Sequence, residues 1–174
     1  MPHREPKGAS VDTTEHLVER LARAVDDLEI RRVITDYAAL VDAREWEGLA
    51  GILADEVVAD YHNGRTVVTG ARAMVDYIRD NTAHLAWQHH MVAPYGVDVA
   101  GDRATAQAYL VSHQMLKDDP SHVLMMAATY DLEFDRGERG WVLSRMVHTI
   151  KVANHLPITT APPNGAAVPP AVSH

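Results

Sequence analysis

The chain contains no cysteine, which excludes disulfide bonds, thiol catalysis and cysteine-ligated metal sites. It contains only one phenylalanine, so aliphatic side chains, methionine, tyrosine and tryptophan have to fill the core. No apolar run approaches the roughly 20 residues that a membrane-spanning helix needs. The segment from Met1 to Ser10 is polar and lacks the apolar stretch of a secretory signal.

Positive charge is also scarce, because 16 Lys and Arg residues face 24 Asp and Glu residues, for a net charge of −8. Nucleic acids and anionic membranes bind basic patches, so we expect neither as a partner. A glycine-rich phosphate loop, a nucleophile-elbow serine and a dinucleotide fingerprint are absent from the sequence. We therefore expect a cytoplasmic protein that acts on a small molecule without a cofactor.

Length and composition predict one domain. We expect a flexible leader at 1–12, a globular domain at 13–156 and a Pro-rich tail at 157–174. The tail contains Pro162-Pro163 and Pro169-Pro170, and it is expected to be disordered or to wrap a neighbouring subunit.

Hydrophobic periodicity predicts helices first and strands afterwards. Helical spacing indicates helices over about 14–41, 45–54 and 71–81, the first of which could be one helix or two. A short hairpin is expected at 57–61 and 65–69, around the turn His62-Asn63-Gly64. Four longer strands, separated by turn signals, are expected at 88–99, 103–117, 122–135 and 140–152. This order predicts an α+β fold in which helices close a strongly curved, mostly antiparallel sheet into a cone around a pocket.

A carboxyl group and a phenol near the end of the long helix, those of Asp42 and Tyr37, are the first candidate catalytic groups. Asp42 lies at the negative end of the helix dipole, which is unfavourable by roughly 0.3–1 kcal/mol, so a histidine partner would compensate it. Tyr37 lies one turn earlier. The alternative interpretation is that Asp42 is a solvated turn residue, or the N-cap of the next helix.

Histidines in the predicted strands are the second group of candidates. Adjacent strand residues point to opposite faces, so only one of His89 and His90 can enter the pocket. His113 lies on the next strand, on a face that also carries Tyr109, Val111 and Met115. Its alternative role is that of a core histidine. A neutral imidazole beside a carboxylate is an efficient general base near pH 7, which suits elimination of water or enolisation.

Weaker candidates for binding a substrate are Tyr61, Tyr130, Asn63 and Met126, although each could simply belong to the core or the surface. His148 alternates with two apolar residues of the last strand and could also face inward. We expect no catalytic metal, because no HExxH motif is present and the adjacent histidines cannot both reach one ion.

The segment 34–46, with Tyr37, Asp42 and Trp46, resembles the first-helix signature of the SnoaL-like, scytalone-dehydratase-like family of the NTF2-like superfamily. Gln88-His89-His90 resembles the strand that carries this family's catalytic histidine, and the segment around His113 resembles the strand with the second histidine of scytalone dehydratase. Bile-acid 7α-dehydratase and hexachlorocyclohexane dehydrochlorinase are similar proteins.

The resemblance implies that His90 is the general base, that Asp42 orients it, and that Tyr37, Tyr61 and His113 assist. It also implies a homo-oligomer, a dimer or trimer, that packs through the outer face of the sheet. Val41, Ala128 and Tyr130 depart from the scytalone dehydratase pattern, so scytalone is not the expected substrate. The leading prediction is a dehydratase. The alternatives are an isomerase or polyketide cyclase that uses the same base, and a non-catalytic ligand-binding module.

Overall fold

The structure is a computed structural model that describes residues 9–158, with side chains from Thr13 onward. Its first element is the long helix α1 (Ala9–Ala43), which begins five residues before the expected start at Thr14. The second half of α1 packs on the sheet through Ile30, Ile34, Tyr37 and Val41, which recur every three or four residues and are almost fully buried. Of the leader expected at 1–12, residues 9–12 belong to α1, and residues 1–8 lie outside the described residues. Of the tail expected at 157–174, Pro157 ends β6, and residues 159–174 lie outside the described residues.

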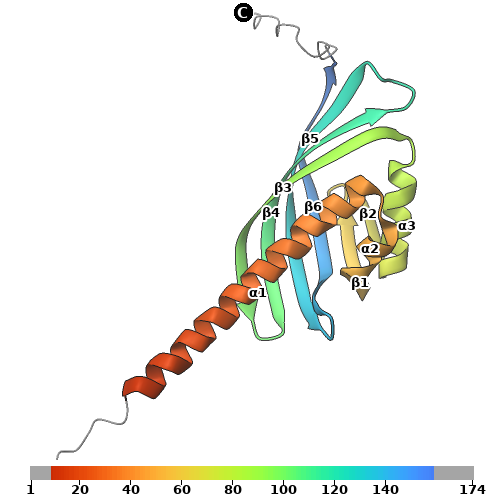
Figure 1. Ribbon diagram of the computed structural model, residues 1–174. Coiled ribbons are helices and arrows are strands. Elements are labelled where there is room, and N and C mark those ends of the chain that lie inside the picture. Colours follow the sequence, from red (N-terminus) through yellow and green to blue (C-terminus); the bar gives the residue numbers. More distant parts are fainter. Residues whose placement is uncertain (1–8, 159–174) are drawn as a thin grey trace, which may run out of the picture.

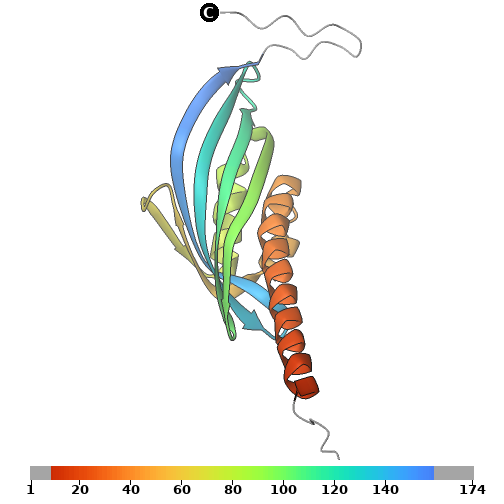
Figure 2. The same cartoon turned by 90° about the vertical axis from the view of Figure 1, so that its left-hand side faces the viewer.

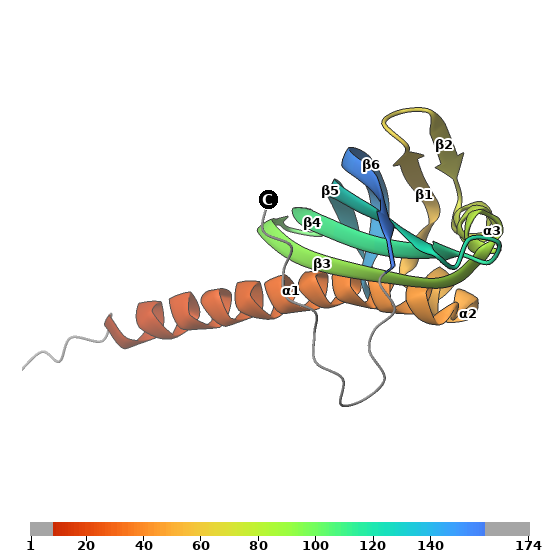
Figure 3. The same cartoon turned by 90° about the horizontal axis from the view of Figure 1, so that it is seen from above.

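A six-stranded curved sheet follows, in the spatial order β2-β1-β6-β5-β4-β3. Its strands are β1 (Leu53–Tyr61), β2 (Thr66–Thr69), β3 (Leu85–Ala100), β4 (Arg103–Leu116), β5 (His122–Gly137) and β6 (Gly140–Pro157). The four long strands form the predicted antiparallel meander, and β1 and β2 form the predicted hairpin. The strands bend around the end of α1 and α3, as Figures 2 and 3 show.

One pairing was not predicted, namely the parallel pairing of β1 with β6. It joins Leu53 to Leu143 and Ala59 to Met146. This contact places the early hairpin beside the last strand, so that it continues the sheet and closes one side of the cone (Figure 1).

The two shorter helices lie next to each other, and α3 packs against the β1–β2 hairpin (Figure 1). Helix α2 (Trp46–Gly51) is shorter than the predicted 45–54, because Leu53 already belongs to β1 and pairs with β6. Helix α3 (Ala71–Thr82) agrees with its prediction.

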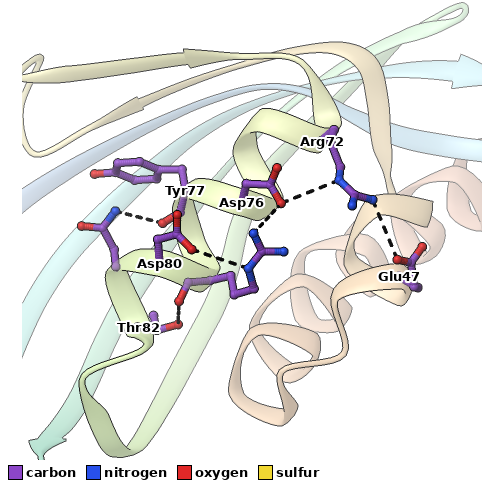
Figure 4. Close-up of polar contacts among 8 residues, drawn as sticks. Glu47, Arg72, Asp76, Tyr77, Asp80 and Thr82 are labelled. Atoms are coloured by element: carbon purple, nitrogen blue, oxygen red, sulfur yellow. Dashed lines mark hydrogen bonds and ion pairs between the residues drawn. The ribbon is translucent and has the colours of Figure 1, made fainter.

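Helix α3 turns its charged face away from the sheet. Arg72 lies 4.0 Å from Glu47 of α2 and 3.7 Å from Asp76, and Asp76 also pairs with Arg79 at 2.9 Å (Figure 4). The opposite face of α3 buries Met74, Val75 and Ile78, which leaves that face in contact with the interior of the cone.

Within the described residues, no helix is long and apolar enough to span a membrane.

Candidate active site

Asp42 and His90 form a two-point contact between the end of α1 and β3. Nδ1 of His90 lies 2.5 Å from Oδ1 of Asp42, and the backbone N–H of His90 donates to Oδ2 at 2.8 Å. Both side chains are mostly buried: 12% of the His90 side chain and 22% of the Asp42 side chain are exposed. An ionised Asp42 accepts the Nδ1 proton and therefore leaves the lone pair of Nε2 free.

Neighbouring contacts explain why these two residues meet. The side-chain amide of Gln88 donates to the carbonyl of Val41 at 2.6 Å, and Arg44 donates to the carbonyl of Leu85 at 2.7 Å. The last turn of α1 is thus fastened to the first residues of β3. Gln88 and His90 point to the same face of the strand because they are two residues apart. The donors of His90 also compensate a carboxylate placed at the negative end of the helix.

His90 opens into a cavity of about 390 Å³ between α1, α3 and the concave face of the sheet. This volume lies in the range that holds one small organic molecule. Most of the wall is apolar or aromatic, and polar groups reach it at a few points. The lining residues are Tyr37, Val41, Tyr61, His62, Tyr77, Ile78, Asn81, Thr82, His84, His90, Leu110, Ser112, Gln114, Leu124, Met126, Tyr130, His148 and Ile150.

Three tyrosines gather on one side of this cavity. The hydroxyl oxygens of Tyr37 and Tyr61 lie 3.4 Å apart, and the ring of Tyr130 packs edge-on against Tyr37 at 6.2 Å. Burial raises the pKa of each of these three phenols, so all three remain protonated at neutral pH. Two hydroxyls that share one hydrogen bond still hold a second proton, which can be donated to an oxygen of a bound molecule.

His148 faces the same cavity and was not among the principal candidates from the sequence. Its ring lies 5.2 Å from the ring of Tyr130 and 6.2 Å from that of Tyr61, and its Nε2 is buried without a hydrogen-bond partner. Burial, together with the charges of His62 and His90, lowers the pKa of His148 to about 4, so the imidazole is neutral at pH 7. The alternation with Met146 and Ile150 was the sequence signal for this residue.

The structure corrects the expected position of His113. Residues directly opposite each other in an antiparallel pair share a face, and His113 lies opposite His89, whereas Ser112 lies opposite His90. The rings of His89 and His113 stack at 6.2 Å on the outer face of the sheet. The apolar residues around His113 belong to that outer face, which the sequence pattern alone could not distinguish from the inner one.

The remaining candidates are divided between the cavity and the surface. Tyr61, Tyr130 and Met126 line the cavity, as the sequence suggested. Asn63 does not line it, because its side chain accepts from the N–H of Ile150 at 2.7 Å and donates to the carbonyl of the same residue at 3.2 Å. Asn63 therefore holds the β1–β2 turn against β6. Among the side chains that the structure describes, from Thr13 to residue 158, no three metal-ligating groups lie together.

Comparisons with known proteins agree with this architecture. An uncharacterized protein of Mycobacterium tuberculosis is 24% identical over 129 residues, which cover 74% of this chain and 88% of that protein. Hexachlorocyclohexane dehydrochlorinase LinA-type3 of Novosphingobium barchaimii superposes with a TM-score of 0.69 at 19% identity, covering 87% of this chain and 99% of the other. A proposed scytalone dehydratase of Novosphingobium aromaticivorans gives a TM-score of 0.67 at 18% identity, covering 90% and 99%.

At these identities the solved structures establish the fold. The family follows from a separate finding, because residues 22–147 match the model of the SnoaL-like domain. That match covers most of the chain, including α1 from its middle onward and all strands up to the middle of β6. The chain therefore belongs to the SnoaL-like domain family and adopts the NTF2-like α+β cone.

Proposed function

We propose that this protein is a cofactor-independent lyase that removes water from a cyclic, mostly apolar small molecule activated by a carbonyl group. The observation that carries the proposal is the pairing of Asp42 with Nδ1 of His90, since it leaves Nε2 as a base directed into the cavity. The dehydrochlorinase and the proposed dehydratase among the structural neighbours favour the same class of reaction, elimination.

The first step is removal of a proton from the carbon next to the carbonyl. Nε2 of His90 takes this proton, and Asp42 stabilises the imidazolium that forms. The electron pair of the broken C–H bond moves into an enolate. The Tyr37–Tyr61 pair donates a hydrogen bond to the enolate oxygen, because both phenols stay protonated.

The second step breaks the bond between carbon and the leaving hydroxyl. The enolate electrons form the new C=C bond, and the hydroxyl leaves with the electron pair of the C–O bond. The imidazolium of His90 returns its proton to that oxygen, so water is released and the base is regenerated. The sequence prediction gave part of this step to His113. His113 takes no part in the step, because it lies on the other face of the sheet.

The test is turnover of a panel of cyclic β-hydroxyketones by the wild type and three variants. We expect His90→Ala and Asp42→Asn to lower kcat by about 10²- to 10⁴-fold while the melting temperature shows that the fold survives. His113→Ala is the matched control and should keep its activity, since it removes a histidine of the next strand that points outward. Full activity in both cavity variants would remove the proposal.

Product mass separates the reaction classes. Dehydration lowers the mass by one water, whereas isomerisation or cyclisation without loss of water leaves it unchanged. Products of unchanged mass would assign the same base to an isomerase or cyclase. Binding of the panel without turnover would indicate a ligand-binding module.

A further inference from the structure

The first half of α1 carries a row of exposed apolar side chains. Leu17, Val18, Leu21, Val25 and Leu28 have between 52% and 66% of their surfaces exposed. This half of the helix extends beyond the strands, as Figures 1 and 3 show. Leucines and valines gathered on one helix are usually buried, so this row requires a partner.

The other described elements, up to residue 158, do not cover this row, because it faces away from the sheet. At about 100° per residue, Leu17, Leu21 and Leu28 point roughly 140° away from the buried stripe of Ile30 and Ile34. Helix α1 thus has two apolar faces, one in each half, on nearly opposite sides.

Polar contacts occupy the sheet side of the projecting half. Asp26 accepts a hydrogen bond from Nε1 of Trp141 at 3.1 Å and pairs with Arg136 at 2.8 Å. Further along, Arg31 donates to the carbonyl of Pro94 at 2.9 Å. These contacts fix the rotation of the helix and leave the apolar row turned outward.

The spacing of the row is that of a helix–helix seam. Leu17, Leu21, Ala24 and Leu28 follow one another at intervals of four, three and four, as the core positions of a coiled coil do. In an antiparallel pair of identical helices, Leu17 of one helix meets Leu28 of the other, and Leu21 meets Ala24. This arrangement buries all four positions in both copies.

Charge favours the antiparallel arrangement. Arg20 and Asp27 flank the seam on the same side, at equivalent positions of successive heptads. Antiparallel pairing brings Arg20 of each copy beside Asp27 of the other, where it adds to the existing ion pair of Asp27 with Arg31. Val18 and Val25 meet on the opposite flank. An anionic membrane is a poorer occupant, because acidic and basic side chains alternate beside the row, including the ion pair of Glu19 with Arg23.

We propose that residues 17–28 of α1 form an antiparallel two-helix interface with the same segment of a second copy of this chain. The sheets of the two copies then lie on opposite sides of the helix pair, since each row points away from its own sheet. The interface is independent of the proposed reaction.

The first experiment measures molar mass by sedimentation equilibrium over a range of concentrations. We expect a dimer with a Kd of roughly micromolar to 0.1 mM, because three helical turns bury a modest area. Leu21→Glu should weaken the dimer by roughly 100-fold or more, since it places a charge in the seam of both copies. Circular dichroism checks that the variant is folded, as the exposure of Leu21 leads us to expect.

The matched control is Tyr109→Glu, which adds the same charge to an exposed apolar residue on the outer face of the sheet. This variant should keep the dimer. A dimer lost in Tyr109→Glu and kept in Leu21→Glu would place the interface on the sheet and overturn the proposal. A monomer at all concentrations up to about 1 mM would also overturn the proposal. It would indicate that residues 159–174 of the same chain contact the apolar row.

The direction of the helices is tested by cysteine cross-linking, for which the cysteine-free chain gives a clean background. A mixture of Leu17→Cys and Leu28→Cys proteins should form a disulfide-linked dimer on mild oxidation, whereas neither protein should do so alone. Efficient cross-linking of Leu17→Cys with itself would show parallel helices and contradict the arrangement.

Discussion

Two of the histidines that line the cavity, His90 and His148, differ in what holds them. His90 is fixed by Asp42 through Nδ1 and through its backbone N–H, so its orientation and tautomer are set before any ligand arrives. His148 is packed between aromatic rings, and its Nε2 has no polar partner. A carboxylate therefore prepares one imidazole to accept a proton, while burial keeps the other uncharged.

The depressed pKa of His148 predicts a loss of stability in acid. Its folded pKa of about 4 lies below the unfolded value near 6.5, so between these values the unfolded chain binds a proton that the folded chain does not. Stability contributed by the neutral imidazole is present above about pH 6.5 and is lost as pH falls toward 4, by up to about 3 kcal/mol.

Urea denaturation of the wild type and of His148→Gln at pH 7 and pH 4.5 measures this effect. His62 and His90 lie near His148 in both proteins, so the difference between the two losses of stability isolates His148. The wild type should lose more free energy of unfolding than the variant. Equal losses would show that His148 is not the group responsible.

At the scale of elements, α1 is anchored to the far end of the sheet through one carboxylate. Asp26 is largely buried and contacts both Trp141 and Arg136, whose guanidinium lies 4.3 Å from the centre of the Trp141 ring. Asp26→Ala should lower the free energy of unfolding by about 1–3 kcal/mol, since it leaves the buried N–H of Trp141 without its acceptor and removes one of the two carboxylates that pair with Arg136, the other being Asp102.

The control is an ion pair on the same helix. Asp36 pairs with Arg32 at 3.4 Å, and both side chains are well exposed. Asp36→Ala should therefore cost less than about 0.5 kcal/mol. Chemical denaturation measures both variants, and similar losses in the two would refute the anchoring role of Asp26.

The β1–β2 turn depends on Asn63, whose φ of 60° lies in the left-handed region. Asparagine tolerates this conformation, and its amide also holds Ile150. Asn63→Ala should lower the free energy of unfolding by about 1–2 kcal/mol, because it adds backbone strain and removes two hydrogen bonds. Asn63→Gly relieves the strain alone and should cost less. If thermal denaturation shows that Asn63→Gly is less stable than Asn63→Ala, backbone strain does not explain the loss of stability in Asn63→Ala.

At the scale of the molecule, we expect a ligand that binds in the cavity to stabilise the fold. A ligand at 100 times its Kd should stabilise the fold by about 2.7 kcal/mol. Met126→Trp places a larger side chain on the cavity wall and should abolish this stabilisation without unfolding the protein. Thermal shift with a bicyclic ketone measures it. An unchanged shift in Met126→Trp would show that the ketone binds elsewhere.

The assembly expected from the family resemblance, a dimer or trimer through the outer sheet face, stays a prediction. That face does expose Trp87, Met91 and Tyr109, each by about half of its surface. The experiments on Leu21 and Tyr109 distinguish it from the interface proposed on α1. The expected cytoplasmic location and the absence of nucleic-acid partners also stay predictions.

The sequence by itself predicted most of the elements and named Asp42 and His90 as candidate site residues. Helical and alternating periodicities are local properties, so they predicted the long helix, the hairpin and the four-strand meander. The motif around Asp42 and Gln88-His89-His90 singled out two residues that the structure brings within hydrogen-bonding distance.

Tertiary structure alone decided which face of each strand points inward. An alternating strand can present either of its two faces to the interior, and the neighbouring strands and helices decide which one. His113 therefore lies on the outer face of the sheet, and His148 lines the cavity. The parallel pairing of β1 with β6 joins segments about 90 residues apart and has no local signal. The same holds for the two apolar faces of α1, because periodicity shows that both exist, while only packing shows which one the domain buries.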